Sequence, residues 1–317
     1  MNRELKKRLH DLGILPVVKL EDASLAVQLG KALRAGGING AEITFRTDQA
    51  VPALQALRQA FPDMLLAAGT VLNVEQAKAA KEAGADLLVS PGIDPEILDW
   101  AKKNDMPVLP GCSSASDVMV AANHGLDAVK LFPAEAAGGL PLVRALSGPF
   151  PTMQFVPSGG IGRENVSDWL KEPQVLAASG SWMVTGNDPA AVAALADEAM
   201  KTVLELKLAH IGINADNETQ AHRIAQFFET VFGFGARENP ASIFSDTYVE
   251  ILKSPYLGQK GHIAISTPDV ERAVAYLENK GIVFNKESTV LRESGCIQAI
   301  YLEQEIGGFA IHLVRKG

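Results

Sequence analysis

Short apolar runs alternate with amphipathic segments along the first two thirds of the chain. The apolar runs have the length of strands, and the segments between them space alanine and leucine as helices do and end at glycine. We expect strands at ILPVVKL, AEITF, LLAAGT, DLLVS, MPVLP, DAVKLF, MQFVP and VLAASGS, and helices at segments such as SLAVQLGKALRAGG and VEQAKAAKEAG. Strands that alternate with helices in this way predict an α/β fold, a parallel (β/α)8 TIM barrel, over residues 1–206.

The pattern changes at residue 207. HIGIN and GHIAIST are strand-like phrases, and each leads into a helix-like segment that β-branched and aromatic strand signals follow. The two copies lie about 50 residues apart, which indicates an internal repeat. We therefore expect a second, α+β domain over residues 207–317, built of two βαβββ modules.

Composition narrows the class of protein. Of the 317 residues, 47% are hydrophobic and 21% are charged, which is typical of globular domains rather than of a disordered chain. The formal net charge of -8 argues against nucleic acid as a partner, because phosphate binding needs a basic face. A small anionic substrate is compatible with this charge, since a local pocket can be positive on an acidic protein.

Targeting signals and paired cysteines are lacking in the sequence. The charged start MNRELKKRLHDLG is unlike a signal peptide, and no stretch reaches the roughly 18 apolar residues of a membrane span, so we expect a cytoplasmic protein without a membrane partner. Cys112 and Cys296 lie far apart in the sequence. We expect free thiols rather than a disulfide or a thiolate metal cluster.

Polar residues and glycines stand where the predicted barrel strands end. Barrel enzymes place their chemistry at the C-terminal ends of the strands. The candidates at these ends are Glu42, Arg46, Thr70, Pro91, Lys130, Ser158, Gly159, Gly160 and Ser181.

Lys130 is the unusual member of this group, because it lies inside a short apolar strand. An apolar setting disfavours the ammonium form and so favours the neutral amine that can attack a carbonyl. Glu42 would supply the nearby acid and base that Schiff-base chemistry needs. Arg46 offers a planar fork for a carboxylate, with a hydroxyl donor from Thr70. The SGGIG and SGS turns expose backbone N–H groups suited to a phosphate.

Ordinary interpretations of the same residues stay open at this point. A strand lysine can extend to solvent or pair with an acid, and a glycine-rich turn after a strand is usually only a turn. Glu42 could be simply the salt-bridge partner of Lys130 or Arg46. A barrel isomerase or epimerase would use Glu42 as base and leave Lys130 an electrostatic role. A catalytically silent sugar-phosphate sensor would bind its ligand without turnover.

A family resemblance favours the first hypothesis. GGINGAEITFRT, AAGTVLN, VSPGIDPE, PGCSSASDV, AVKLFPAEAAGG, FVPSGGI and SGSWMV resemble, in order, the motifs of the 2-keto-3-deoxy-6-phosphogluconate / 4-hydroxy-2-oxoglutarate (KDPG/KHG) aldolases. The likeness covers nearly the whole first domain. It implies a class I aldolase with a (β/α)8 barrel that needs no cofactor for cleavage, acts on a phosphorylated sugar acid or small 2-keto acid, and assembles as a homotrimer.

The resemblance also implies residue roles. Lys130 would form the Schiff base and Glu42 would move protons through water. The pyruvyl carboxylate would lie near Arg46 and Thr70, with Pro91 and Phe132 shaping the pocket, and the distal phosphate would lie on Gly159, Gly160 and Ser181. Ser158 departs from the threonine that the family often carries, which keeps the hydroxyl and loses a methyl group, so it bears on the preferred substrate more than on the reaction class.

The second domain carries a constellation of its own. His210 and His262 open equivalent strands of the two copies, and Glu250 and His312 occupy corresponding late strands. Neutral imidazoles and a carboxylate are suitable ligands for zinc, nickel, manganese or iron. The pattern resembles the vicinal oxygen chelate superfamily, which includes glyoxalase I, although His312 replaces the glutamate common at the last ligand position. The superfamily also contains metal-free binding proteins, so a structural or regulatory module is the alternative.

Overall fold

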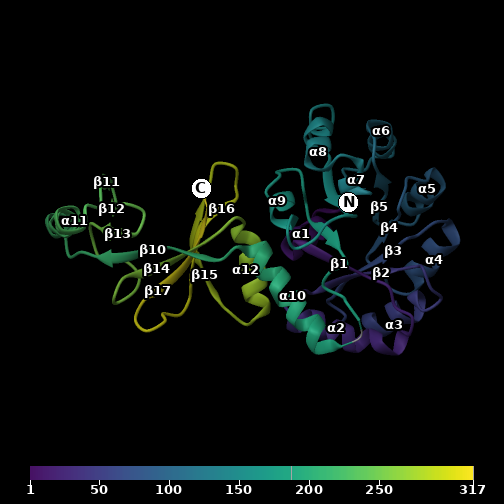
Figure 1. The fold of residues 1–317 in the computed structure, drawn as a ribbon, viewed down its shortest axis with the longest axis horizontal. Helices are drawn as coiled ribbons and strands as arrows, with labels where there is room; N and C mark the ends of the chain where they lie inside the picture. The colour runs from purple at the N-terminus through teal and green to yellow at the C-terminus, as the bar shows by residue number, and fades with distance from the viewer. Residues whose placement is uncertain (187, 317) are drawn as a thin grey trace. The chain divides into compact units, whose positions relative to one another are not determined.

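The computed structural model describes residues 1–186 and 188–316 (Figure 1). It divides into two compact units, Met1–Val203 (unit 1) and Leu204–Gly317 (unit 2). The change in sequence pattern had placed the boundary slightly later, after residue 206. Among the helices of the described ranges, none combines the length and the hydrophobicity of a membrane span.

Unit 1 alternates strands with helices. Its strands are β1 (Ile14–Val18), β2 (Gly40–Thr44), β3 (Leu65–Gly69), β4 (Leu87–Val89), β5 (Val108–Leu109), β6 (Gly111–Cys112), β7 (Ala128–Leu131), β8 (Gln154–Pro157) and β9 (Ala178–Gly180). Its helices are α1 (Arg3–Leu12), the 3-10 helix η1 (Ala23–Leu25), α2 (Ala26–Ala35), α3 (Ala50–Ala60), α4 (Val74–Glu82), α5 (Pro95–Lys103), α6 (Ala115–Asn123), α7 (Ala134–Ala137), α8 (Gly139–Ser147), α9 (Val166–Leu170) and α10 (Pro189–Leu204).

The strands of unit 1 pair in parallel. Six form a sheet of order β5-β4-β3-β2-β1-β9, and three form a sheet of order β6-β7-β8. An isolated parallel bridge between Ser158 and Ser179 joins the end of β8 to β9. The predicted α/β fold with a parallel sheet is thereby confirmed. Every residue of β2 and β3 is buried, as expected where helices cover a parallel sheet.

Local sequence explains where several helices begin. Asp94 precedes α5 and its side chain accepts from the N–H of Glu96, and Ser114 forms a capping box with Asp117 at the start of α6. Helix α1 was not among the predicted elements. Most of its residues are charged or polar, and the side that it buries consists of three leucines.

The predicted strand MPVLP contains the short strand β5, and a second short strand, β6, follows its last residue, Pro110. Proline has no N–H to offer a strand partner. Its carbonyl still accepts from the N–H of Lys130 at 3.0 Å, which ties this strand to β7. The interruption therefore leaves Lys130 anchored through its backbone.

Unit 2 is built on one sheet. Its strands are β10 (Lys207–Asn214), β11 (Ala236–Glu238), β12 (Ser242–Ser245), β13 (Val249–Leu252), β14 (His262–Thr267), β15 (Phe284–Leu291), β16 (Ile297–Leu302) and β17 (Ala310–Arg315), and its helices are α11 (Glu218–Phe232) and α12 (Val270–Asn279). The strand order is β11-β12-β13-β10-β14-β17-β16-β15. The central pair β10 and β14 is antiparallel, whereas β10 pairs with β13, and β14 with β17, in parallel.

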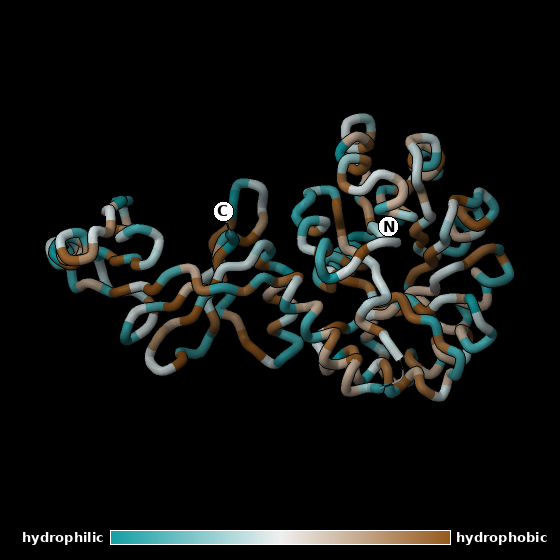
Figure 2. The backbone as a smooth tube through the Cα atoms, viewed as in Figure 1, coloured by the Kyte–Doolittle hydropathy of each residue, from teal (hydrophilic) through white to brown (hydrophobic). Residues whose placement is uncertain are grey.

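Each helix of unit 2 packs on one half of its sheet, α11 on β12 and β13, and α12 on β16 and β17. Under α11 the core consists of small and branched residues, Ala221, Ala225, Ile243 and Ile251 among them. Figure 2 shows hydrophobic segments along the strands of both units and hydrophilic segments in many of the turns. The opposite face of the unit 2 sheet is therefore free to carry polar side chains.

Candidate active site and candidate metal centre

A buried ion pair joins two strands of unit 1. The Nζ of Lys130, on β7, is 3.2 Å from Oε1 of Glu42, on β2. Both side chains are less than a tenth exposed. The second carboxylate oxygen of Glu42 accepts a hydrogen bond of 3.1 Å from Oγ of Ser179, on β9. Three separate strands thus bring an amine, a carboxylate and a hydroxyl together away from bulk water.

A glycine makes room for this carboxylate. Gly69 ends β3, and a Cβ at that position would lie 2.4 Å from Oε1 of Glu42. Contacts that short do not occur between a Cβ and a neighbouring atom, so any larger residue would push the carboxylate away from Lys130. Because Gly69 has no side chain, the end of β3 leaves room for the Glu42 carboxylate beside Lys130.

The residues expected to bind a carboxylate also gather. Nε of Arg46 donates to Oγ1 of Thr70 at 3.3 Å. The Nζ of Lys130 lies 5.3 Å from the centre of the Phe132 ring, which forms one wall beside the amine. Pro91 is held close to β6, because a Cβ on Gly111 would lie 2.2 Å from the Pro91 carbonyl oxygen. Glycine is required at that crossing.

The SGGIG turn after β8 has a backbone that suits an anion site. Gly159 and Gly160 have φ of 90° and 81°, the left-handed region that favours glycine. The side chain of Glu135 packs beneath Gly160, where it accepts from the indole N–H of Trp169 at 2.8 Å. Ser158 is buried and bridges to β9. These contacts hold the turn at the strand ends.

A cavity of about 340 Å³ opens beside these residues. Arg46 and Ser181 line it, together with Lys19 and the apolar side chains of Leu20, Leu29 and Val192. Neither Lys130 nor Glu42 is among its lining residues. Lys19, just past the end of β1, was not singled out from the sequence.

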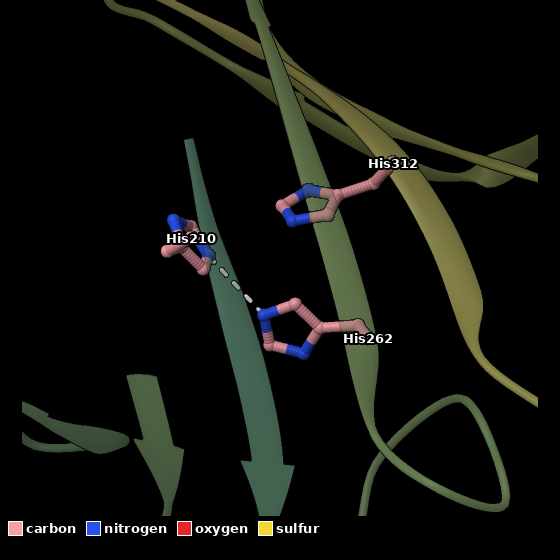
Figure 3. A group of neighbouring side chains, drawn as sticks. All are labelled: His210, His262 and His312. Carbon is pink, nitrogen blue, oxygen red and sulfur yellow. Dashed lines mark hydrogen bonds between the residues drawn. The ribbon is translucent and has the colours of Figure 1, made fainter. Parts of the chain in front are cut away.

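In unit 2, the four predicted ligands converge from four strands. Nε2 of His210 (β10) and Nε2 of His262 (β14) are 3.2 Å apart. Oε2 of Glu250 (β13) lies 3.2 Å from the first and 3.3 Å from the second. His312 (β17) joins them, since ring nitrogens of the three histidines all lie within 4.8 Å of one another. Figure 3 shows the three rings directed toward a common centre.

These separations fit a metal ion. Ligand atoms at about 2.0–2.1 Å from a tetrahedral ion are about 3.4 Å from one another. Both ring nitrogens of His312, and Nδ1 of His262, are buried without a hydrogen-bond partner. Buried polar atoms without partners are rare in folded proteins. A metal ion bound at Nε2 or Nδ1 would satisfy at least part of this deficit.

The protonation states also suit a metal. Burial raises the pKa of the Glu250 carboxyl, but hydrogen bonds from His210, His262 and Ser242 lower it by more, so it lies well below its usual value. Burial, and then the neighbouring His262 and His210, lower the pKa of His312 to about 3. Glu250 is therefore a carboxylate and His312 a neutral imidazole at neutral pH, the forms that bind metals.

A glycine again makes the arrangement fit. Gly212 lies on β10 opposite His262, and a Cβ there would be 1.9 Å from a carbon of the His262 ring. The imidazole therefore lies across the bare backbone of β10, toward His210 and Glu250. The glycine at the third position of HIGIN therefore also marks this site in the sequence, although the candidate ligands were chosen without it.

A second group of potential ligands in unit 2 is exposed. Glu218, His222 and Glu238 lie close enough to share an ion. Nζ of Lys253 already pairs with Glu218 at 2.8 Å and with Glu238 at 2.5 Å. The ammonium group of Lys253 already balances the two carboxylates of this exposed cluster. The cluster differs in this respect from the buried group of His210, His262 and His312.

Comparison with known proteins bears on unit 1. A family model described as KDPG and KHG aldolase matches residues 5–195, more than half of the chain. The chain belongs to the KDPG and KHG aldolase family. It is an aldolase, and therefore a carbon–carbon lyase.

Individual relatives are similar over most of their own length. The 2-dehydro-3-deoxy-phosphogluconate aldolase of Haemophilus influenzae is 41% identical over 182 residues, 57% of this chain and 86% of the relative. That of Treponema pallidum is 42% identical over 200 residues, 62% of this chain and 95% of the relative. A KDPG aldolase structure from Legionella pneumophila, with pyruvate captured as a covalent carbinolamine, has 36% identity and a TM-score of 0.59 over 61% of this chain and 97% of its own.

Within the aldolase, the structure brings most predicted residues together. Lys130 and Glu42 are in contact, as are Arg46 and Thr70, and the glycine turns lie at the neighbouring strand ends. Sequence reasoning missed the contribution of Ser179, although it lies in the SGS turn that was singled out. Its position beside Glu42 depends on pairing between β1 and β9, which no local pattern reveals.

Proposed function

We propose that this aldolase cleaves 2-keto-3-deoxy-6-phosphogluconate to pyruvate and glyceraldehyde 3-phosphate through a Schiff base on Lys130. The observation that carries the proposal is the buried contact between the amine of Lys130 and the carboxylate of Glu42. Glu42 takes a proton from the Lys130 ammonium, the neutral amine attacks the C2 carbonyl, and loss of water gives a protonated imine. The imine accepts the electron pair of the C3–C4 bond as that bond breaks.

Proton transfers fall to Glu42. The carboxylate removes the proton of the C4 hydroxyl, directly or through water, as the aldehyde leaves. The resulting enamine then takes a proton at C3, and hydrolysis of the imine releases pyruvate and restores the amine. Ser179 holds Glu42 by its second oxygen, so that the first oxygen stays directed at Lys130.

The substrate's two charged ends are assigned to two separate groups of residues. Arg46 and Thr70 bind the carboxylate next to the carbonyl, with Pro91 and Phe132 as walls. Four residues bind the distal phosphate, Ser158, Gly159, Gly160 and Ser181. The left-handed glycine turn supports this assignment, because successive N–H groups in such a turn can point at one anion.

A 4-hydroxy-2-oxoglutarate, which would give pyruvate and glyoxylate, is the proposed second substrate. It has the same 2-oxo acid head but a carboxylate in place of the distal phosphate. We also propose a closed (β/α)8 barrel, supported by the Ser158–Ser179 bridge, and a homotrimer, which light scattering would test.

Pyruvate release from a panel of 4-hydroxy-2-oxo acids tests the proposed reaction and its substrate. Lys130→Ala should abolish release, whereas Lys78→Ala, which changes an exposed lysine, should leave it intact. Pyruvate release that survives Lys130→Ala would contradict the Schiff base on Lys130. Conversion of the substrate without pyruvate release would favour an isomerase-like site that uses Glu42 as base. Binding of the phosphorylated substrate without turnover in the unmodified protein would favour a sensor.

We propose further that unit 2 is a pair of βαβββ modules of the vicinal oxygen chelate type and binds one divalent metal, zinc, nickel, manganese or iron. The ligands would be His210, Glu250, His262 and His312. Such an ion would polarise an oxygen atom of a bound ligand. The support is the convergence of these side chains and the unpaired buried nitrogens of His312.

Elemental analysis of the purified protein tests the metal site. Joint replacement of His210 and Glu250 should remove the metal, and His222→Asn in the exposed cluster should not. Lys130→Ala should also leave the metal content unchanged, because its contacts lie in unit 1. Metal that stays bound after replacement of His210 and Glu250 would exclude the proposed ligands.

A further inference from the structure

The strand register of unit 2 sets side chains in a row that crosses the metal-facing side of the sheet. The paired positions run in the order Arg237, Phe244, Glu250, Gly212 and His262. Directly paired residues project to the same side of a sheet. Arg237 therefore stands on the face that carries the candidate ligands.

Ring contacts agree with this register. The guanidinium carbon of Arg237 lies 5.5 Å from the centre of the Phe244 ring, over its face. The Phe244 ring in turn meets the His210 ring edge-on at 5.3 Å. Together these distances place the guanidinium within about 11 Å of the His210 ring. Phe244 is thus a platform that holds the cation beside the metal centre.

The other module lacks such a cation. Its equivalent row runs in the order Asn285, Tyr301, His312, Ala264 and His210. Asparagine stands where the first module has Arg237, and Tyr301 stands where it has Phe244. The Tyr301 ring stacks on His312 at 4.5 Å. The two rows therefore differ at their outer position, where one has an arginine and the other an asparagine.

Arg237 is also without an acidic partner. Among the described residues, no carboxylate lies within ion-pairing distance of its guanidinium, whose contact is with Phe244. The adjacent acid, Glu238, pairs with Lys253 and with His222 of α11. The guanidinium of Arg237 thus pairs with no carboxylate of the described residues and stands on the face that carries the candidate metal ligands. It is therefore available to bind an anion from solution.

We propose that the metal centre of unit 2 takes a small 2-oxo diacid, whose 2-oxo acid head binds the metal and whose distal carboxylate binds Arg237. This inference rests on the metal site proposed above. The guanidinium lies at most about 11 Å from the His210 ring, so a short diacid can reach from the candidate ligands to Arg237. Five-carbon diacids are of this kind, and they include the 4-hydroxy-2-oxoglutarate proposed as an aldolase substrate.

Two ligands that differ only at the distal end test this inference. 2-Oxoglutarate and 2-oxopentanoate share the 2-oxo acid head and the chain length, and only the first has a distal carboxylate. The full chain carrying Lys130→Ala, which removes the amine expected to react with both, would be loaded with cobalt(II). Visible absorption of the cobalt reports binding of each acid without any need for turnover.

We expect 2-oxoglutarate to bind about tenfold more tightly than 2-oxopentanoate. Adding Arg237→Met should bring the two affinities together, and Arg237→Lys should keep part of the preference. Arg223→Met, an exposed arginine on α11, is the matched control and should change neither affinity.

The two proposals fail in different ways. A protein that takes up cobalt but binds both acids equally, or that keeps its preference after Arg237→Met, overturns the diacid inference alone. A protein that takes up no cobalt at the four ligands overturns the metal site and this inference with it.

Discussion

Gly212→Ala adds a single methyl group where the structure leaves no room for one. The new Cβ would lie 1.9, 2.1 and 2.3 Å from three atoms of the His262 ring, whereas real Cβ contacts are longer than 3.0 Å. The ring would have to move by about an ångström, and metal sites tolerate only about 0.2 Å in ligand distance. We expect metal affinity to fall by about 100-fold or more, and the strain to lower stability by about 1–3 kcal/mol.

Chelator competition measures the affinity, and metal content per chain gives the occupancy. Gly235→Ala is the matched control, because the nearest atom to its new Cβ is 3.7 Å away, an ordinary contact. The control should bind metal as the unmodified protein does. If Gly212→Ala binds equally well, His262 does not hold a metal from the position described.

Two substitutions and one labelling experiment test unit 1 further. Ser179→Ala leaves one oxygen of a buried carboxylate without its donor, so kcat for pyruvate release should fall about tenfold or more, and an unchanged kcat would remove Ser179 from the site. Gly69→Ala should lower kcat further by displacing Glu42, and a crystal structure with the carboxylate still beside the amine would contradict this. Burial raises the pKa of the Cys112 thiol from 9.0 to about 12, so this thiol stays protonated at pH 9. Iodoacetamide should therefore label the exposed Cys296 first. Equal labelling of the two cysteines in a mass spectrum would contradict the burial of Cys112.

Much of unit 1 could be predicted because its signals are local. Apolar runs of strand length mark buried parallel strands, and the candidate residues follow directly from where those runs end. Contacts made by pairing distant strands are less accessible to sequence. The hydrogen bond from Ser179 to Glu42 joins residues 137 positions apart. The space that Gly69 leaves for Glu42 likewise depends on the register between β2 and β3.

In unit 2, the internal repeat allowed all four candidate ligands to be selected before their positions were known. Residues at matching places in the repeated pattern, such as His210 and His262, lie on adjacent strands of one sheet, so candidates chosen from the pattern meet there. The differences between the two halves of the pattern carry the remaining information. Arg237 and Asn285 are equivalent by register but not by chemistry, and no periodic pattern distinguishes their roles.

Lys130 as the Schiff-base residue is the central claim, and reductive trapping tests it most directly. Borohydride added to the protein with pyruvate would convert the imine to a stable secondary amine, which peptide mass spectrometry locates. The account predicts a pyruvate-derived adduct on the peptide that contains Lys130, and none in Lys130→Ala. A protein that releases pyruvate from its substrate but shows no adduct, or an adduct on a different lysine, would contradict it.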